Sequence, residues 1–100
     1  MKKVIVAIGA HLDDIELAAG GTLAKAVREG HDVHMIVMSQ SGYTDYNGNL
    51  MRTDEVAMQE GRNAAKVLGV KDLDILDFSN KDIAYDSRAV EAIEKRINII

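Results

Sequence analysis

Short runs of consecutive apolar residues alternate along this chain with longer segments in which apolar residues recur at helical spacing. The runs occupy residues 4–8 and 32–38, a short third strand is expected at 73–78, and the helical segments begin near Ile15, Thr53 and Ser87. Continuous apolar runs are typical of parallel strands that helices cover on both faces. The order β-α-β-α-β-α therefore predicts an α/β fold, a Rossmann-like three-layer structure built on a parallel sheet.

Two glycines mark the expected ends of the first two helices, Gly30 and Gly69, because glycine is common just beyond a helix. Residues 39–50 are polar, without periodicity, and are expected to form a loop long enough to carry function. The first helix is expected to bury a stripe made of Leu17, Ala18, Gly21, Leu23, Ala24 and Val27. The glycine pair at 20–21 would then allow close packing against this helix.

The length and the net charge of the chain limit the classes of function that it can have. One hundred residues are enough for one small domain, and the net charge of -4 comes without a clustered basic face. Nucleic acids and anionic membranes are therefore not expected as partners. The absence of cysteine excludes disulfides and cysteine-type zinc sites. No apolar run approaches the roughly 18 residues of a membrane span. The first run is at the lower limit of length for a secretory signal and is followed at once by HLDDIE, so a cytoplasmic protein is expected.

A cluster of ionisable side chains follows the first strand, in the sequence GAHLDDIE at residues 9–16. In an open α/β sheet, sites form beyond the carboxyl ends of the strands. His11 and Asp14 combine an imidazole and a carboxylate, a normal set of zinc ligands that needs one further protein ligand. Asp13, beside them, is placed to take a proton from metal-bound water.

Helix capping is the alternative interpretation of these carboxylates. Aspartate is favoured at the N-cap, and negative charge in the first turn complements the helix dipole. Capping accounts for one of Asp13 and Asp14, but not for both of them together with His11. Three such groups crowded at the end of a strand need a cation or a substrate to offset their repulsion. We therefore interpret the cluster as a functional site.

The stretch AHLDDIELAAGGTLAKAVREGHDVHMIVMS resembles the amino-terminal signature of the LmbE-like, or PIG-L-type, zinc-dependent N-acetylglucosamine deacetylases. The motif of that family is Ala-His-Pro-Asp-Asp-x-Glu, followed by a Gly-Gly-Thr-Leu helix. The match is closest over residues 4–38 and looser at 52–56, 60–70 and 76–83. The resemblance therefore implies one deacetylase domain over residues 1–100, as the amino-terminal part of a larger domain.

The resemblance implies a role for each matching residue. His11 and Asp14 would be metal ligands, Asp13 the general base, and Glu16 a supporting acid that orients the ligand turn. Arg52 falls where similar proteins place a residue near the substrate, although a surface charge at a helix start is an equally good interpretation of it. Asp82 is a weaker candidate of the same kind.

This sequence departs from the family pattern at two places. Leu12 stands where the family has proline, so the turn is expected to be freer, with no ligand lost. The family takes a further histidine ligand from beyond the length of this chain. His31 and His34 lie away from the carboxyl end of their strand and are expected to be structural or surface residues. The metal site is therefore expected to be incomplete in these residues.

The expected activity is metal-dependent hydrolysis of the acetamide group of an N-acetylated amino sugar. Zinc is the expected metal, and iron or manganese also suit a site rich in oxygen ligands. The alternative is a catalytically incomplete α/β fragment or a small-molecule-binding module that lacks the third metal ligand. An open sheet edge and an apolar last helix favour association into homo-oligomers.

Overall fold

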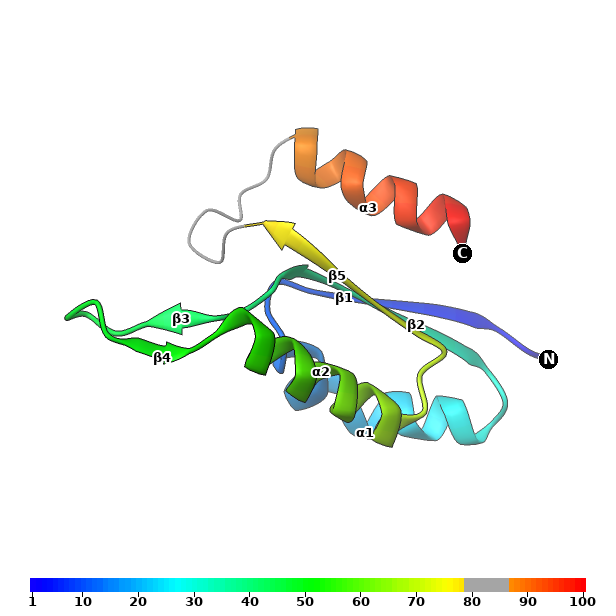
Figure 1. Cartoon of the computed structure of the whole chain (residues 1–100). Coiled ribbons are helices and arrows are strands. Elements are labelled where there is room, and N and C mark those ends of the chain that lie inside the picture. The colour runs from blue at the N-terminus through cyan, green and yellow to red at the C-terminus, as the bar shows by residue number, and fades with distance from the viewer. Residues whose placement is uncertain (79–86) are drawn as a thin grey trace.

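The computed structural model describes residues 1–78 and 87–100 (Figure 1). Its elements are, in order, β1 (Val4–Gly9), α1 (Asp14–Arg28), β2 (Asp32–Ser39), β3 (Tyr43–Thr44), β4 (Leu50–Arg52), α2 (Asp54–Leu68), β5 (Asp72–Phe78) and α3 (Ser87–Ile99). The predicted alternation of strands and helices is confirmed, and a short hairpin, β3–β4, is added to it. Within the described residues, no helix combines the length and the apolar character that a membrane span requires.

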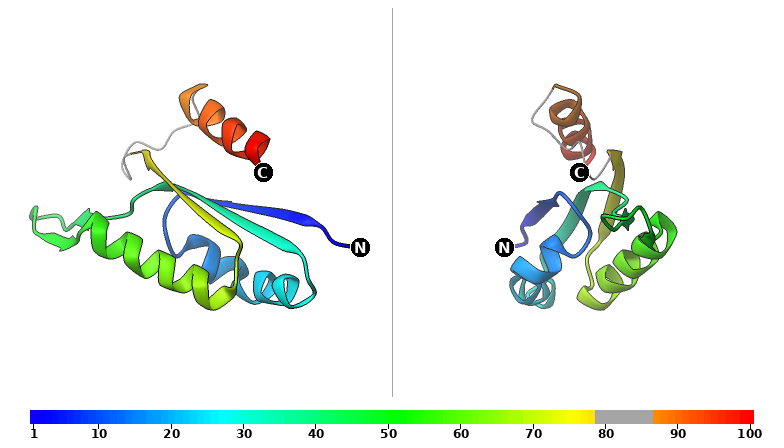
Figure 2. Two further views of the ribbon diagram at one scale, coloured as in Figure 1. Left: turned by 45° about the vertical axis from the view of Figure 1, so that its right-hand side comes forward. Right: turned by 90° about the vertical axis from the view of Figure 1, so that its left-hand side faces the viewer.

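The three long strands form a parallel sheet in the order β1-β2-β5. Helices α1 and α2 lie on one face of this sheet and α3 lies on the other, as the views in Figures 1 and 2 agree. The predicted three-layer α/β architecture is confirmed. Because the strands are parallel, their carboxyl ends lie along one edge of the sheet, where Ser39 pairs with Phe78.

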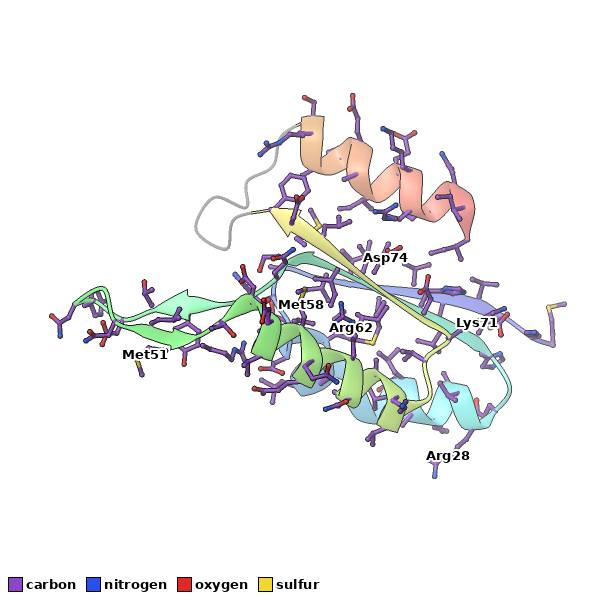
Figure 3. The ribbon with its side chains drawn as sticks, viewed as in Figure 1. Arg28, Met51, Met58, Arg62, Lys71 and Asp74 are labelled. Carbon is purple, nitrogen blue, oxygen red and sulfur yellow. The ribbon has the colours of Figure 1, made fainter. Side chains whose placement is uncertain are left out.

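Strand β2 is the centre of two apolar clusters, one on each face of the sheet. Toward α1 and α2 it contributes Val33, Met35 and Val37, and toward α3 it contributes Ile36 and Met38. On the α3 side, Asp74 of β5, labelled in Figure 3, forms an ion pair with Arg96, with 3.4 Å between Asp74 Oδ2 and Arg96 Nε. The continuous apolar run of β2 is thus explained by burial on both faces.

Strand β1 departs from the prediction that it is buried on both faces. It lies at the edge of the described sheet, and the side chains of Val4 and Ile8 are 58% and 45% exposed. A continuous apolar run predicts a strand in a covered sheet, but it does not predict the strand's place within that sheet. That place depends on pairing between residues far apart in the sequence, such as Val6 with His34.

The buried face of α1 also differs from the expected stripe. The helix buries Ile15, Leu23 and Ala26, whereas Leu17 is 86% exposed. A Cβ atom added at Gly20 or Gly21 would meet nothing within 4 Å, so the close packing expected at this pair is wrong. Among the helical glycines of the described residues, the one that permits close packing is Gly61 of α2, against which Leu12 packs.

The segment expected to be a loop contains the hairpin β3–β4. Its turn is organised by Asp45, whose Oδ1 accepts hydrogen bonds from the backbone N–H groups of Asn47 and Asn49, both at 2.9 Å. Gly48 takes the left-handed backbone conformation that this turn requires, with φ 80°. The hydrogen bond from the Asn49 N–H is the largest of the effects that hold the pKa of Asp45 below its usual value.

Gly42, between β2 and the hairpin, is expected to be intolerant of a side chain. Its N–H donates to Asp54 Oδ1 at 2.8 Å, and an added Cβ would lie 2.6 Å from the backbone nitrogen of Asp54. Gly42→Ala should therefore lower the free energy of unfolding by roughly 1–3 kcal/mol, measured by urea denaturation. Gly21→Ala is the matched control, because the exposed helical position has open space and should become more stable, by about 0.5–1 kcal/mol. Equal effects at the two positions would contradict the assignment.

Candidate active site

The acidic turn lies between the carboxyl end of β1, at Gly9, and the start of α1, at Asp14. Two hydrogen bonds close it: the Asp14 N–H donates to the His11 carbonyl oxygen at 3.3 Å, and the His11 N–H donates to Asp14 Oδ2 at 2.9 Å. The turn therefore sits at the edge of the sheet where α/β folds place their sites, as the sequence predicted.

His11 and Asp14 lie side by side at this turn. The distance from His11 Nδ1 to Asp14 Oδ2 is 3.6 Å, and the two side chains are 41% and 50% exposed. Two ligand atoms at 2.0–2.1 Å from a tetrahedral zinc ion are about 3.4 Å apart. The spacing and the donor atoms of the pair thus fit two positions of a zinc site. Among the described residues, no three histidine, aspartate or glutamate side chains converge in a group that could hold a metal.

Asp13 occupies the N-cap position of α1 without acting as a cap. Its backbone is left-handed, with φ 85° and ψ -25°, and its side chain makes no capping hydrogen bond. This conformation costs a non-glycine residue about 1–3 kcal/mol and is concentrated at functional sites. The carboxylate instead faces Arg52, with 3.5 Å between Oδ2 and Nη1. Capping therefore does not account for Asp13.

Arg52 joins the end of β4 to the acidic turn. Besides its contact with Asp13, Nη1 lies 3.7 Å from Glu60 Oε2, and Nη2 donates to the Ser41 carbonyl oxygen at 3.3 Å. The guanidinium also lies over the ring of Tyr43, 5.8 Å from its centroid. With its side chain only 21% exposed, Arg52 packs beside the acidic turn and does not extend into solvent.

Glu16 lies in the first turn of α1, close to the acidic turn. Both of its carboxylate oxygens are buried and have no hydrogen-bond partner within the described part of the chain. Burial raises the pKa of Glu16, and the charges of Asp13 and Asp14 add to the rise. The backbone groups of Glu16 and Asp13 act on the pKa in the opposite direction, but more weakly than burial does. The orienting role expected for Glu16 stays a prediction.

Ser41 and Glu60 belong to the same neighbourhood and were not singled out from the sequence. Ser41 is 5% exposed, has φ 73°, and accepts a hydrogen bond from the Leu12 N–H at 2.8 Å. Its position just beyond the carboxyl end of β2 is the signal that points to it, because sites gather there. Glu60, by contrast, is one of many charges on a helix surface, and only the folded chain brings it to Arg52.

The other candidates lie elsewhere. His31 precedes β2 and accepts a hydrogen bond at Nδ1 from the Lys3 N–H, at 3.0 Å, and His34 is in the amino-terminal half of β2. Both are at the end of the strand opposite the acidic turn, as expected for histidines outside the site. Asp82 lies outside the described residues.

The profile of the GlcNAc-PI de-N-acetylase (PIG-L) family matches residues 6–100. A curated relative from Escherichia coli K12, named as the uncharacterized deacetylase YaiS, is 38% identical over 79 residues, 79% of this chain. A diacetylchitobiose deacetylase from Thermococcus kodakarensis is 29% identical over 86 residues, 83% of this chain. The solved structure of N,N'-diacetylchitobiose deacetylase from Pyrococcus horikoshii, with an inhibitor, matches 94% of this chain with a TM-score of 0.80 and 26% identity.

These matches span a minority of each relative. They cover 40% of the Escherichia coli protein, 32% of the Thermococcus enzyme and 36% of the Pyrococcus chain. The resemblance inferred from the motif is nevertheless confirmed, because the family profile extends over nearly the whole of this sequence. The chain belongs to the GlcNAc-PI de-N-acetylase family, also called PIG-L or LmbE-like.

Proposed function

We propose that this protein is a metal-dependent deacetylase that hydrolyses the acetamide group of an N-acetylated amino sugar. The observation that carries the proposal is the pairing of His11 and Asp14 at zinc-ligand spacing, beside an Asp13 that is strained and does not cap its helix. Membership of a deacetylase family supports the reaction class. The diacetylchitobiose deacetylases among its relatives support a substrate of the N-acetylglucosamine type.

Each side chain of the site has a defined task in this proposal. His11 and Asp14 would hold zinc or a similar divalent metal, which would supply the Lewis acidity that polarises an acetamide carbonyl and acidifies water. The Asp13 carboxylate accepts the proton that the attacking water loses, and passes it to the departing nitrogen. Water adds to the carbonyl carbon, the C–N bond breaks, and the products are acetate and a free amine.

Arg52 holds Asp13 in place and presents hydrogen-bond donors at the mouth of the site. Its contacts with Asp13 and with the Ser41 carbonyl oxygen fix the guanidinium between the acidic turn and the hairpin. A planar guanidinium in that place suits sugar hydroxyl groups as well as carboxylates. We therefore assign Arg52 to substrate binding. We also propose that the protein acts in the cytoplasm and associates into homo-oligomers.

The proposal is tested by acetate release and metal removal. The protein, expressed from its complete reading frame, is incubated with N,N'-diacetylchitobiose or N-acetylglucosamine, and acetate is followed by proton NMR. We expect acetate to be released, to fall at least tenfold after treatment with a chelator, and to recover on addition of zinc. Acetate release that is indifferent to the chelator would contradict the metal. Zinc binding without acetate release from either sugar would favour a binding module instead.

A further inference from the structure

The hydroxyl group of Ser41 links the acidic turn to the carboxyl end of β2. Its oxygen accepts from the Leu12 N–H at 2.8 Å, lies 3.1 Å from Ser39 Oγ, and donates to the Ser39 carbonyl oxygen at 3.1 Å. The Ser41 carbonyl oxygen accepts from Arg52. Both serines are buried, so this small network is shielded from the water that would compete with it.

The network holds the peptide group between His11 and Leu12 from both sides. The carbonyl of that peptide accepts from the Asp14 N–H, and its N–H donates to Ser41 Oγ. A planar peptide held at both ends cannot rotate without breaking one of these bonds. Its orientation fixes the directions of the chain at His11 on one side and, through Leu12, at Asp13 on the other.

The side chain of Leu12 is held as well. It is 3% exposed, and a Cβ atom placed on Gly61 of α2 would come within 2.5 Å of Leu12 Cδ2. Gly61 thus leaves the space in which Leu12 packs. The middle of the acidic turn is therefore fixed by α2 through packing and by Ser41 through a hydrogen bond.

The conformation of Ser41 indicates that the hydroxyl is placed at some cost. A φ of 73° is left-handed, which is uncommon for a residue other than glycine, asparagine or aspartate. Glycine would adopt this backbone without strain but would leave the buried Leu12 N–H without an acceptor. The hydroxyl is the feature of Ser41 that glycine lacks.

We propose that Ser41 is a positioning residue, whose hydroxyl sets the geometry of the acidic turn and so the relative placement of His11, Asp13 and Asp14. The effect on metal binding rests on the proposed function, whereas the effect on the turn does not. Ser41 touches neither of the two hydrogen bonds between His11 and Asp14. Those bonds therefore report whether its influence reaches the proposed ligands.

Three variants separate positioning from stability. Ser41→Ala removes the hydroxyl and keeps the strained backbone, while Ser41→Gly removes the hydroxyl and relieves the strain. Ser39→Ala deletes a hydroxyl from the same buried network but leaves the bond between Ser41 and Leu12 intact. If the substitutions acted only through global stability, amide exchange and zinc affinity would change most in Ser41→Ala, less in Ser39→Ala and least in Ser41→Gly.

The first measurement is amide hydrogen exchange by NMR in the protein expressed from its complete reading frame. In both Ser41 variants we expect the amides of Leu12, His11 and Asp14 to exchange about tenfold faster or more, since each loses or loosens a hydrogen bond. The amide of Ile36, in the buried centre of β2, serves as the reference for global stability. Ser39→Ala should leave the three turn amides unchanged relative to that reference. Unchanged His11 and Asp14 exchange in Ser41→Gly would overturn the proposal.

The second measurement is a zinc titration of the same variants. We expect both Ser41 variants to bind zinc roughly 10–100-fold more weakly than the unchanged protein, and Ser39→Ala to bind as before. Equal zinc affinity in all four proteins would overturn the positioning of the ligands. If the unchanged protein binds no zinc, the proposed metal site fails, and the exchange of the turn amides still decides for or against the role of Ser41.

Discussion

Replacing Asp13 by asparagine is expected to leave bound metal in place and to slow acetate release by roughly 10²–10⁴-fold. The amide of asparagine has nearly the shape of the carboxylate but cannot accept the proton of the attacking water. Asparagine also tolerates the left-handed backbone that residue 13 adopts, so the turn should keep its conformation. The measurements are kcat for acetate release and the metal content of the purified protein.

Glu60→Gln is the matched control for this variant. It makes the same change from carboxylate to amide on a side chain that also contacts Arg52, at 3.7 Å, but that lies on α2 outside the acidic turn. It should retain kcat within a few-fold. Loss of metal from Asp13→Asn would exchange the roles of Asp13 and Asp14, and an undiminished rate would place the general base elsewhere.

The fold was predictable where the sequence pattern reports a local property. Strand β2 is buried on both faces, as its run of apolar residues predicts. The stops at Gly30 and Gly69 were predictable because both glycines take the left-handed conformation that ends a helix, with φ 90° and 80°. The hairpin was missed because its strands have only two and three residues, too short to show alternation.

The orientation of α1 was missed for a different reason. The helix is rich in alanine and glycine, so several faces have similar apolar character, and the sequence alone does not choose among them. The choice is made by packing: Ile15, Leu23 and Ala26 belong to the same buried cluster as Val33 of β2. Leu17 is the most apolar residue of the opposite face and is left exposed.

The place of the candidate site in the fold was predictable, but its internal contacts were not. The rule that α/β sites lie beyond the strand ends located the acidic turn. That rule does not reveal the left-handed backbone of Asp13 or the proximity of Arg52, which follows Asp13 by 39 residues in the sequence. That Leu12 leaves the turn freer than proline would stays a prediction, although the structure adds two contacts that the sequence did not reveal: the side chain of Leu12 is buried and its N–H donates to Ser41.

Removal of either proposed ligand is expected to abolish the response of the protein to zinc. A ligand present at 100 times its dissociation constant stabilises the folded state by about 2.7 kcal/mol. In His11→Ala and Asp14→Ala this zinc-dependent rise in Tm should disappear, because zinc affinity should fall by more than the roughly 10–100-fold that loss of an outer partner of a ligand costs. The measurements are Tm with and without zinc, and the zinc content after dialysis.

His31→Ala is the control for loss of an imidazole. His31 accepts a hydrogen bond from Lys3 at the opposite end of the sheet, so its removal should lower Tm while leaving the zinc-dependent rise intact. Retention of stoichiometric zinc by both His11→Ala and Asp14→Ala would show that the pair is not the metal site.

Asp14→Asn separates the two interactions of Asp14. Its side chain accepts a hydrogen bond from the His11 N–H at 2.9 Å, an interaction that the carbonyl oxygen of asparagine can retain. If Asp14 served only to close the turn, Asp14→Asn would keep the amide protection of His11 and the zinc response together. As a metal ligand Asp14 needs the negative charge that asparagine lacks, so the variant should keep the protection and lose the zinc response. The divergence of these two readouts in one variant, with the turn intact, assigns the carboxylate to the metal.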